Sequence, residues 1–217
     1  MSTTSFASYS DKLRQAAQYR NAANRYSQNS KKNVTLLVGQ RAPDFTLYNT
    51  YHQQVSLHDL TAHSNVVLLF FPLAFTSVCT AELCSVRDSM RKYTRLNCTV
   101  LGISVDSIFA LNIFKQEQQF SFDLLSDFNK EVARAYGALY EQFPLYGMKG
   151  VTKRAAFVID RRGTIQYAEV FADPGQVPNF VAIEATLAKL ENNQVSDDSD
   201  GSDLSSYLTS LLNRFLP

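Results

Sequence analysis

The sequence predicts an α/β fold, with a mixed sheet flanked by helices and a β-hairpin at the N-terminal end of the domain. Residues 65–71 (NVVLLFF) form an unbroken apolar run, which indicates a strand buried on both faces. Apolar residues then recur at spacings of three and four, the pattern of an amphipathic helix. Strand-like and helix-like segments alternate further along, as expected of a sheet with crossover helices.

The remaining elements follow from local patterns. Apolar and polar residues alternate in two short segments, with Phe45 and Leu47 in the first and Val55 and Leu57 in the second. This pattern predicts a hairpin unit that ends at Leu60. The amphipathic helix after the buried strand is expected to reach Arg95. The later segments are expected to be a strand at 99–106, a helix at 107–118, a strand at 122–125, a helix at 130–139, a hairpin of strands 154–160 and 165–170, and a helix at 178–190.

We expect one folded core with appended segments. Residues 1–33 are polar and basic and are interpreted as a flexible extension, followed by the folded domain at 34–191. Residues 192–203 are polar and acidic, as in a solvated linker. Residues 204–217 carry a narrow apolar stripe and predict a short helix that docks back on its own domain. A dimer contact and a partner's groove are the alternatives for that helix.

Composition narrows the function classes. The 217 residues carry a net charge of +1, so no nucleic-acid partner is indicated. No apolar run is long enough to span a membrane, and residues 1–33 lack the apolar core of a secretory signal. Three cysteines are too few for a disulfide scaffold and favour a reducing compartment. The expected location is the cytoplasm, with an organelle such as a plastid as the alternative if residues 1–33 are a transit segment.

Cys79 is the best-placed of the three cysteines for chemistry. It falls in the first turn of the predicted helix, capped by Thr76 or Ser77, where free amide groups and the helix dipole stabilise a thiolate. The dipole contributes at most about 2 kcal/mol, so a nearby cation is also needed. Arg154, at the start of a later predicted strand, would supply a charge and several hydrogen-bond donors.

Two ordered motifs carry a family resemblance. Residues 72–79 (PLAFTSVC) fit the pattern P-x-x-x-T/S-x-x-C, and residues 154–160 (RAAFVID) fit R-x-x-F-V-I-D. Together with the loop at 146–150 they resemble the peroxiredoxin family, over roughly Val38 to Leu190. The resemblance implies a thioredoxin-like fold and a thiol-dependent peroxidase that reduces hydrogen peroxide and organic hydroperoxides.

The resemblance also implies a role for each matched residue. Cys79 would be the peroxidatic nucleophile, and Pro72 would shield its thiolate and shape the pocket. The Thr76 hydroxyl would hydrogen-bond the peroxide, and Arg154 would orient and stabilise both thiolate and substrate. Neither a metal nor an organic cofactor is needed. The implied partners are a peroxide and thioredoxin or another thiol reductant, and the chain would be a monomer or a homodimer.

Cys84 is the candidate resolving cysteine. Its spacing from Cys79 resembles that in the Q or bacterioferritin-comigratory subgroup, while the neighbouring residues also resemble the one-cysteine E class. Five residues along a helix separate Cα atoms by about 8.6 Å, beyond the about 7 Å reach of a disulfide. We therefore expect a Cys79–Cys84 bond to require local unwinding of the helix.

The other titratable side chains near the motifs have simpler interpretations. Cys98 is expected to be a buried structural cysteine and, secondarily, a backup resolving residue. Glu82 is interpreted as an exposed helix carboxylate or as a partner of pocket cations. The three histidines lack the neighbours of a metal site and are expected on the surface or in loops: His52, His58 and His63.

Two other functions share parts of this pattern. A thioredoxin-like disulfide reductase would use Cys79 and Cys84 as a dithiol, but such sites have C-x-x-C spacing, whereas four residues intervene here. A noncatalytic partner-binding protein would keep the scaffold and act through its terminal extensions. The intact motif residues argue against that second alternative.

Overall fold

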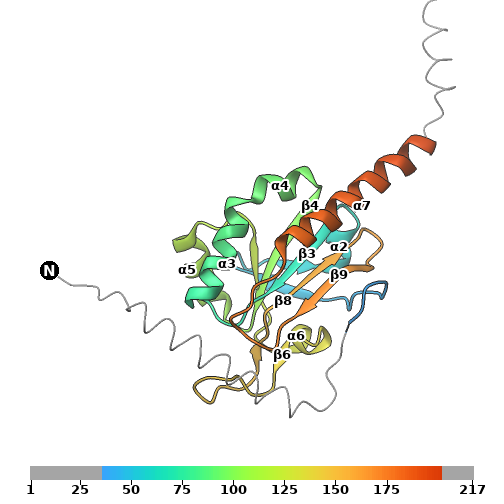
Figure 1. Ribbon diagram of the computed structural model, residues 1–217. Coiled ribbons are helices and arrows are strands. Elements are labelled where there is room, and N and C mark those ends of the chain that lie inside the picture. The colour runs from blue at the N-terminus through green and yellow to red at the C-terminus, as the bar shows by residue number, and fades with distance from the viewer. Residues whose placement is uncertain (1–35, 202–217) are drawn as a thin grey trace, which may run out of the picture.

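The computed structural model describes residues 36–201 (Figure 1). The extension at 1–33 and the helix at 204–217 lie outside these residues. A seven-stranded mixed sheet has the order β2-β1-β5-β4-β3-β8-β9. Its strands are β1 (Thr46–Asn49), β2 (Gln54–Ser56), β3 (Asn65–Phe70), β4 (Cys98–Ser104), β5 (Asp123–Ser126), β8 (Ala155–Ile159) and β9 (Ile165–Val170).

The strand β3 divides the core into two layers. All six of its residues are buried, as the apolar run predicts. Because side chains alternate across a strand, Val66, Leu68 and Phe70 pack into one cluster, while Val67 and Leu69 pack into the other. The mixed sheet flanked by helices is therefore confirmed, with β3 in its interior between β4 and β8.

Helices cover both faces of the sheet (Figure 1). The second cluster lies beneath α3 (Ser77–Asp88), α4 (Met90–Arg95), α5 (Ile108–Gln118) and α7 (Phe180–Gly201). The first cluster lies beneath α2 (Leu57–Thr61) and α6 (Glu131–Ala135). No helix of residues 36–201 combines the length and the apolar character needed to cross a membrane.

Most predicted strands and the helix at 107–118 agree with the structure to within two residues at each end. The predicted hairpin is also present as β1 and β2, and β1 additionally pairs with β5, which extends the sheet. The helix predicted to reach Arg95 breaks at Ser89 into α3 and α4. Asp88 and Ser89 favour such a break, since their side chains compete for backbone hydrogen bonds.

Two further boundaries differ from the prediction near the site. The helix expected at 130–139 ends at Ala135, because Gly137 adopts the left-handed conformation with φ 65° and turns the chain. The residues that follow form β6 (Leu139–Tyr140), which pairs with β7 (Val151–Thr152) in a small second sheet. This sheet brings the 141–150 loop toward the start of β8.

The acidic segment at 192–203 is expected to be a linker, and the structure describes its backbone as helical as far as Gly201. The helix α7 begins at Phe180, two residues after Pro178, and continues to Gly201. No Gly or Pro interrupts residues 180–200, so nothing in the backbone stops the helix earlier, and Gly201 is a residue at which helices commonly end. Charge alone therefore does not predict where α7 ends.

The pairing of β3 with β8 determines which residues meet at the site. The two strands are antiparallel, with Phe70 opposite Ala155. The end of β3, which leads into α3, therefore lies beside the start of β8. Arg154, immediately before β8, is placed next to the loop that precedes Cys79.

Candidate active site

Cys79 lies in the first turn of α3, beneath the surface. The helix begins at Ser77, and Thr76 is the N-cap, with an extended backbone at φ −78° and ψ 146°. The preceding Phe75 has φ 64°, so the chain turns sharply from the end of β3 into the helix. Only 1% of Cys79 is exposed. The thiol is therefore at the amide-rich end of α3, where an anion is stabilised.

Thr76 caps α3 with its backbone and not with its side chain. Its hydroxyl donates to the carbonyl oxygen of Leu73 at 2.9 Å and makes no capping bond. The first-turn amides of α3 are thus left without a side-chain acceptor from this residue. The lone pairs of Thr76 Oγ1 are available to a donor such as a peroxide O–H.

Arg154 reaches the thiol from the neighbouring strand. Its guanidinium is 1% exposed, and Nη2 donates to Cys79 Sγ at 3.3 Å. Nη2 and Nε both donate to the carbonyl oxygen of Pro174, at 3.0 and 3.3 Å. A planar guanidinium held at several points presents a fixed positive charge to the sulfur.

Glu82 completes the arrangement, and its position corrects the expectation of an exposed carboxylate. It is 3% exposed, and its Oε2 accepts a hydrogen bond from Arg154 Nη1. The alternative expectation, that Glu82 is the partner of a cation in the pocket, agrees with the structure. The sequence contained a signal: Glu82 is three residues after Cys79, on the helix face that also carries Leu83 and Val86. A carboxylate on an apolar face needs a buried partner.

A small cavity of about 50 Å³ lies above the thiol. Pro72, Thr76, Cys79 and Arg154, the four motif residues, all line it. The opposite wall comes from the 141–150 loop and is apolar: Phe143, Tyr146 and Met148. The structure thus brings together four of the five residues that sequence reasoning named for the site.

Cys84, the fifth residue, lies further along α3 and does not line the cavity. It is half-buried, and its Sγ is 3.6 Å from Gln118 Oε1 on α5. Three residues later, Arg87 Nη1 donates to the backbone carbonyl of Gln118 at 2.7 Å. All three cysteines are free thiols, and α3 is unbroken between Cys79 and Cys84. This segment of α3 is therefore tied to the end of α5.

Cys98 and the histidines take no part in the cavity. Cys98 packs beside the second core cluster, and desolvation raises the pKa of its thiol to about 12. Within residues 36–201 no three His, Cys, Asp or Glu side chains are grouped as metal ligands.

Comparison with known proteins places this geometry in a family. The model of the AhpC/TSA family matches residues 38–168. Alkyl hydroperoxide reductase E of Mycobacterium tuberculosis is 40% identical over 144 residues, covering 65% of this chain and 90% of that protein. A chloroplastic 2-cysteine peroxiredoxin of Chattonella marina var. antiqua is 36% identical over 147 residues, covering 63% of this chain and 72% of its own length.

Solved structures agree on the fold. Peroxidoxin BcpB from Mycobacterium tuberculosis superposes with a TM-score of 0.61 at 29% identity, covering 70% of this chain and 97% of that one. The mitochondrial 2-Cys peroxiredoxin from Plasmodium falciparum gives 0.61 at 26% identity, covering 77% and 99%. The thioredoxin-like fold expected from the sequence is confirmed by these peroxiredoxin neighbours.

Proposed function

The chain belongs to the AhpC/TSA family of peroxiredoxins and is a thiol-dependent peroxidase, and we propose that Cys79 is its peroxidatic cysteine. The observation that carries this proposal is the contact of Arg154 Nη2 with Cys79 Sγ, 3.3 Å, at the N-terminal end of α3. The guanidinium and the helix end both stabilise the thiolate, which is the nucleophilic form.

The first step is a displacement at oxygen. The Cys79 thiolate attacks one oxygen of the peroxide, an S–O bond forms and the O–O bond breaks. The departing oxygen takes the electron pair and then a proton from solvent, leaving as water or an alcohol. Arg154 is placed to stabilise the charge that develops on the peroxide oxygens, while the Thr76 hydroxyl, whose proton is donated to Leu73, is placed to accept a hydrogen bond from the peroxide O–H. Cys79 becomes a sulfenic acid.

The size and lining of the cavity support two proposed substrates, hydrogen peroxide and organic hydroperoxides. Its about 50 Å³ exceeds the about 10–15 Å³ that a cavity needs to hold one water molecule, so it has room for the two oxygens of a peroxide. Phe143, Tyr146 and Met148 give its wall the apolar character that an alkyl chain requires. Tyr146 is 82% exposed, so a longer chain can extend past it to the surface.

We propose that Cys84 resolves the sulfenic acid. Its thiolate attacks Cys79 sulfur, an S–S bond forms, the S–O bond breaks, and the departing hydroxide takes a proton from solvent to become water. In the reduced structure α3 is helical through both residues, so its first turns must unwind before the sulfurs meet. Thioredoxin or a similar dithiol then reduces the disulfide and is itself oxidised.

A coupled peroxidase assay tests this proposal. Peroxide consumption is measured with thioredoxin, thioredoxin reductase and NADPH for the wild type, Cys79→Ser, Cys84→Ser and Cys98→Ser. We expect no turnover with Cys79→Ser, strongly reduced turnover with Cys84→Ser and wild-type turnover with Cys98→Ser. Full activity of Cys79→Ser defeats the proposal, and insulin reduction without peroxide turnover favours a disulfide reductase.

Compartment and assembly are part of the proposal. The three free thiols suit a reducing compartment, for which we propose the cytoplasm. A plastid is the alternative, which the relative named as chloroplastic supports. We expect a monomer or a homodimer. Imaging of a tagged full-length chain and sedimentation velocity test the two statements separately.

A further inference from the structure

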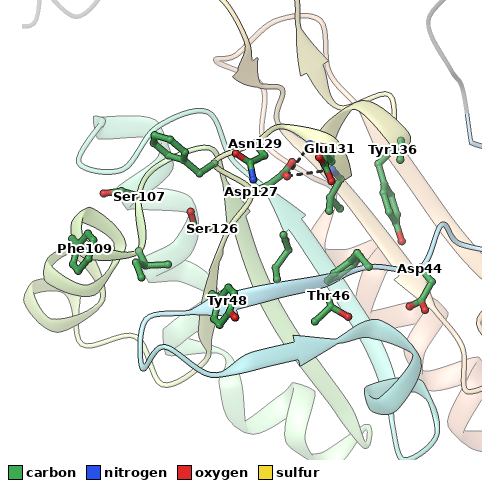
Figure 2. Close-up of a pocket in the computed structure, with 16 residues that line it drawn as sticks. Asp44, Thr46, Tyr48, Ser107, Phe109, Ser126, Asp127, Asn129, Glu131 and Tyr136 are labelled. Carbon is green, nitrogen blue, oxygen red and sulfur yellow. Dashed lines mark hydrogen bonds between the residues drawn. The ribbon is translucent and has the colours of Figure 1, made fainter.

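A second hollow, which we call the β1 groove, lies away from the thiol. It has a volume of about 630 Å³ and shares no lining residue with the cavity at Cys79. Figure 2 shows it running over β1, from Asp44 and Tyr136 at one end to Ser107 and Phe109 at the other. The peroxidase chemistry uses none of its residues. Its size and position call for a separate explanation.

The β1 groove has an apolar floor and an aromatic rim. Phe45 and Tyr136 are buried beneath it as members of the first core cluster. Tyr48, Phe109 and Phe128 stand at its edge with 50%, 69% and 60% of their surface exposed. Exposed large aromatic side chains gathered around a hollow are characteristic of a surface that binds another chain.

The groove is also acidic. Asp44, Asp127 and Glu131 line it, and no Lys, Arg or His does. Asp127 is occupied by the start of α6, since its carboxylate accepts from the amides of residues 131, 132 and 133. Burial, and to a smaller extent the charge of Glu131, raises the pKa of Asp127. Among residues 36–201 no ion pair includes Asp44 or Glu131. Asp44 Oδ1 accepts a hydrogen bond from the backbone amide of His58 at 3.1 Å, a neutral donor that leaves the negative charge of Asp44 uncompensated. The charges of Asp44 and Glu131 are therefore available to a cationic partner.

The chain itself contains a segment with the complementary chemistry. Residues 1–33 hold six Lys or Arg and one acid, a net charge of +5, together with Phe6 and three tyrosines. They lead into Leu36, which packs against the same core cluster that forms the floor of the groove. The segment is thus joined to the body on the face of the sheet where the groove opens.

We propose that residues 1–33 dock in the β1 groove, with aromatic side chains against its rim and basic side chains toward Asp44 and Glu131. Charge favours this segment over the other occupants. Residues 202–217 contain one Asp and one Arg and bring no net positive charge to an acidic groove. A second copy that paired groove to groove would oppose two identical acidic surfaces, which repel each other. This inference does not depend on the catalytic roles proposed above.

Photo-crosslinking of the full chain tests the docking. A benzoylphenylalanine in place of Phe128 is expected to crosslink within its own chain to peptides from residues 1–33. The yield is expected to fall about tenfold in the double variant Asp44→Asn/Glu131→Gln and to fall in 1 M salt, where the screening length is about 3 Å. The matched charge control is Asp88→Asn/Glu117→Gln, which removes two carboxylates outside the groove and is expected to keep the yield.

A position control and four contradicting outcomes complete the experiment. The same crosslinker at Val181, 78% exposed on α7, is expected to give no product with residues 1–33. Products with residues 202–217, products between two chains, or no product from position 128 overturn the proposal. A yield that does not respond to the groove carboxylates also overturns it.

Discussion

Arg154 donates a hydrogen bond from Nη2 to Cys79 Sγ at 3.3 Å, across 75 positions of the chain. The same guanidinium donates from Nη1 to Glu82, one turn further along α3. The sulfur and the carboxylate therefore share one buried cation. This arrangement fixes the guanidinium against the sulfur and makes its removal costly both for the chemistry and for the fold.

Replacing Arg154 by Lys is expected to lower the second-order rate constant for peroxide by about 10²- to 10³-fold, as for the loss of a positioned donor in other active sites. A lysine keeps the charge but lacks the planar fork that bonds Cys79, Glu82 and the Pro174 carbonyl together. Stopped-flow measurement of peroxide reduction checks this. Arg162→Lys, whose side chain is 86% exposed, is the matched control. A rate within twofold of wild type would contradict the assigned role.

Glu82 is expected to act as a positioning residue through Arg154. Glu82→Gln keeps a hydrogen-bond acceptor and is expected to lower the peroxide rate constant about tenfold while changing the free energy of unfolding by about 1 kcal/mol. Glu82→Ala leaves the Arg154 charge buried and unpaired, and is expected to destabilise the protein by about 3–5 kcal/mol. Urea unfolding and stopped-flow kinetics measure the two effects. Equal rates for wild type and Glu82→Gln would reduce Glu82 to a structural role.

The motif residues could be found from the sequence because each occupies a recognisable local position. Cys79 follows a buried strand and opens a helix, and Arg154 precedes a run of buried strand residues. Their contact could not be read from local patterns, since it depends on the antiparallel register that places Phe70 opposite Ala155. Periodicity identifies a strand and does not identify its partner.

The misread segments have a common physical cause. Glu82 is expected to be exposed, and the residues after Asn192 to form a solvated linker, because both are charged. In the structure a long-range partner decides the first case and an uninterrupted backbone the second. The short pairing of β6 with β7 was also not predicted, because two-residue strands carry too little sequence signal.

The link between α3 and α5 is expected to slow resolution by Cys84. Arg87→Ala removes the bond to the Gln118 carbonyl, so α3 unwinds more readily and the disulfide forms faster. The ratio of disulfide to sulfinic acid is therefore expected to be higher in Arg87→Ala than in the wild type. Mass spectrometry at increasing peroxide measures that ratio.

Gln118→Ala is the matched control for this link, because it keeps the backbone carbonyl that Arg87 contacts and removes only the side chain near Cys84. It is expected to change the ratio less than Arg87→Ala does. An unchanged or lower ratio of disulfide to sulfinic acid in Arg87→Ala would show that unwinding of α3 does not limit resolution.

Cys98 is expected to make stability depend on alkaline pH. Burial raises the pKa of its thiol to about 12, above the about 8.5 of an unfolded cysteine. The contribution of the neutral Cys98 thiol to the free energy of unfolding is therefore complete below about pH 8.5. This contribution is lost as the pH rises toward 12, at up to about 1.4 kcal/mol per pH unit. Urea unfolding between pH 8 and 10 is expected to show a steeper decline for wild type than for Cys98→Val. Parallel curves would rule out this titration.

The central claim is that Cys79, and neither other cysteine, is oxidised by peroxide. The most direct measurement treats Cys84→Ser with one equivalent of hydrogen peroxide, traps sulfenic acid with dimedone and maps the labelled peptide by mass spectrometry. We expect the label on Cys79 alone, and in the wild type a Cys79–Cys84 disulfide in its place. A label on Cys98 with Cys79 unmodified would contradict the account.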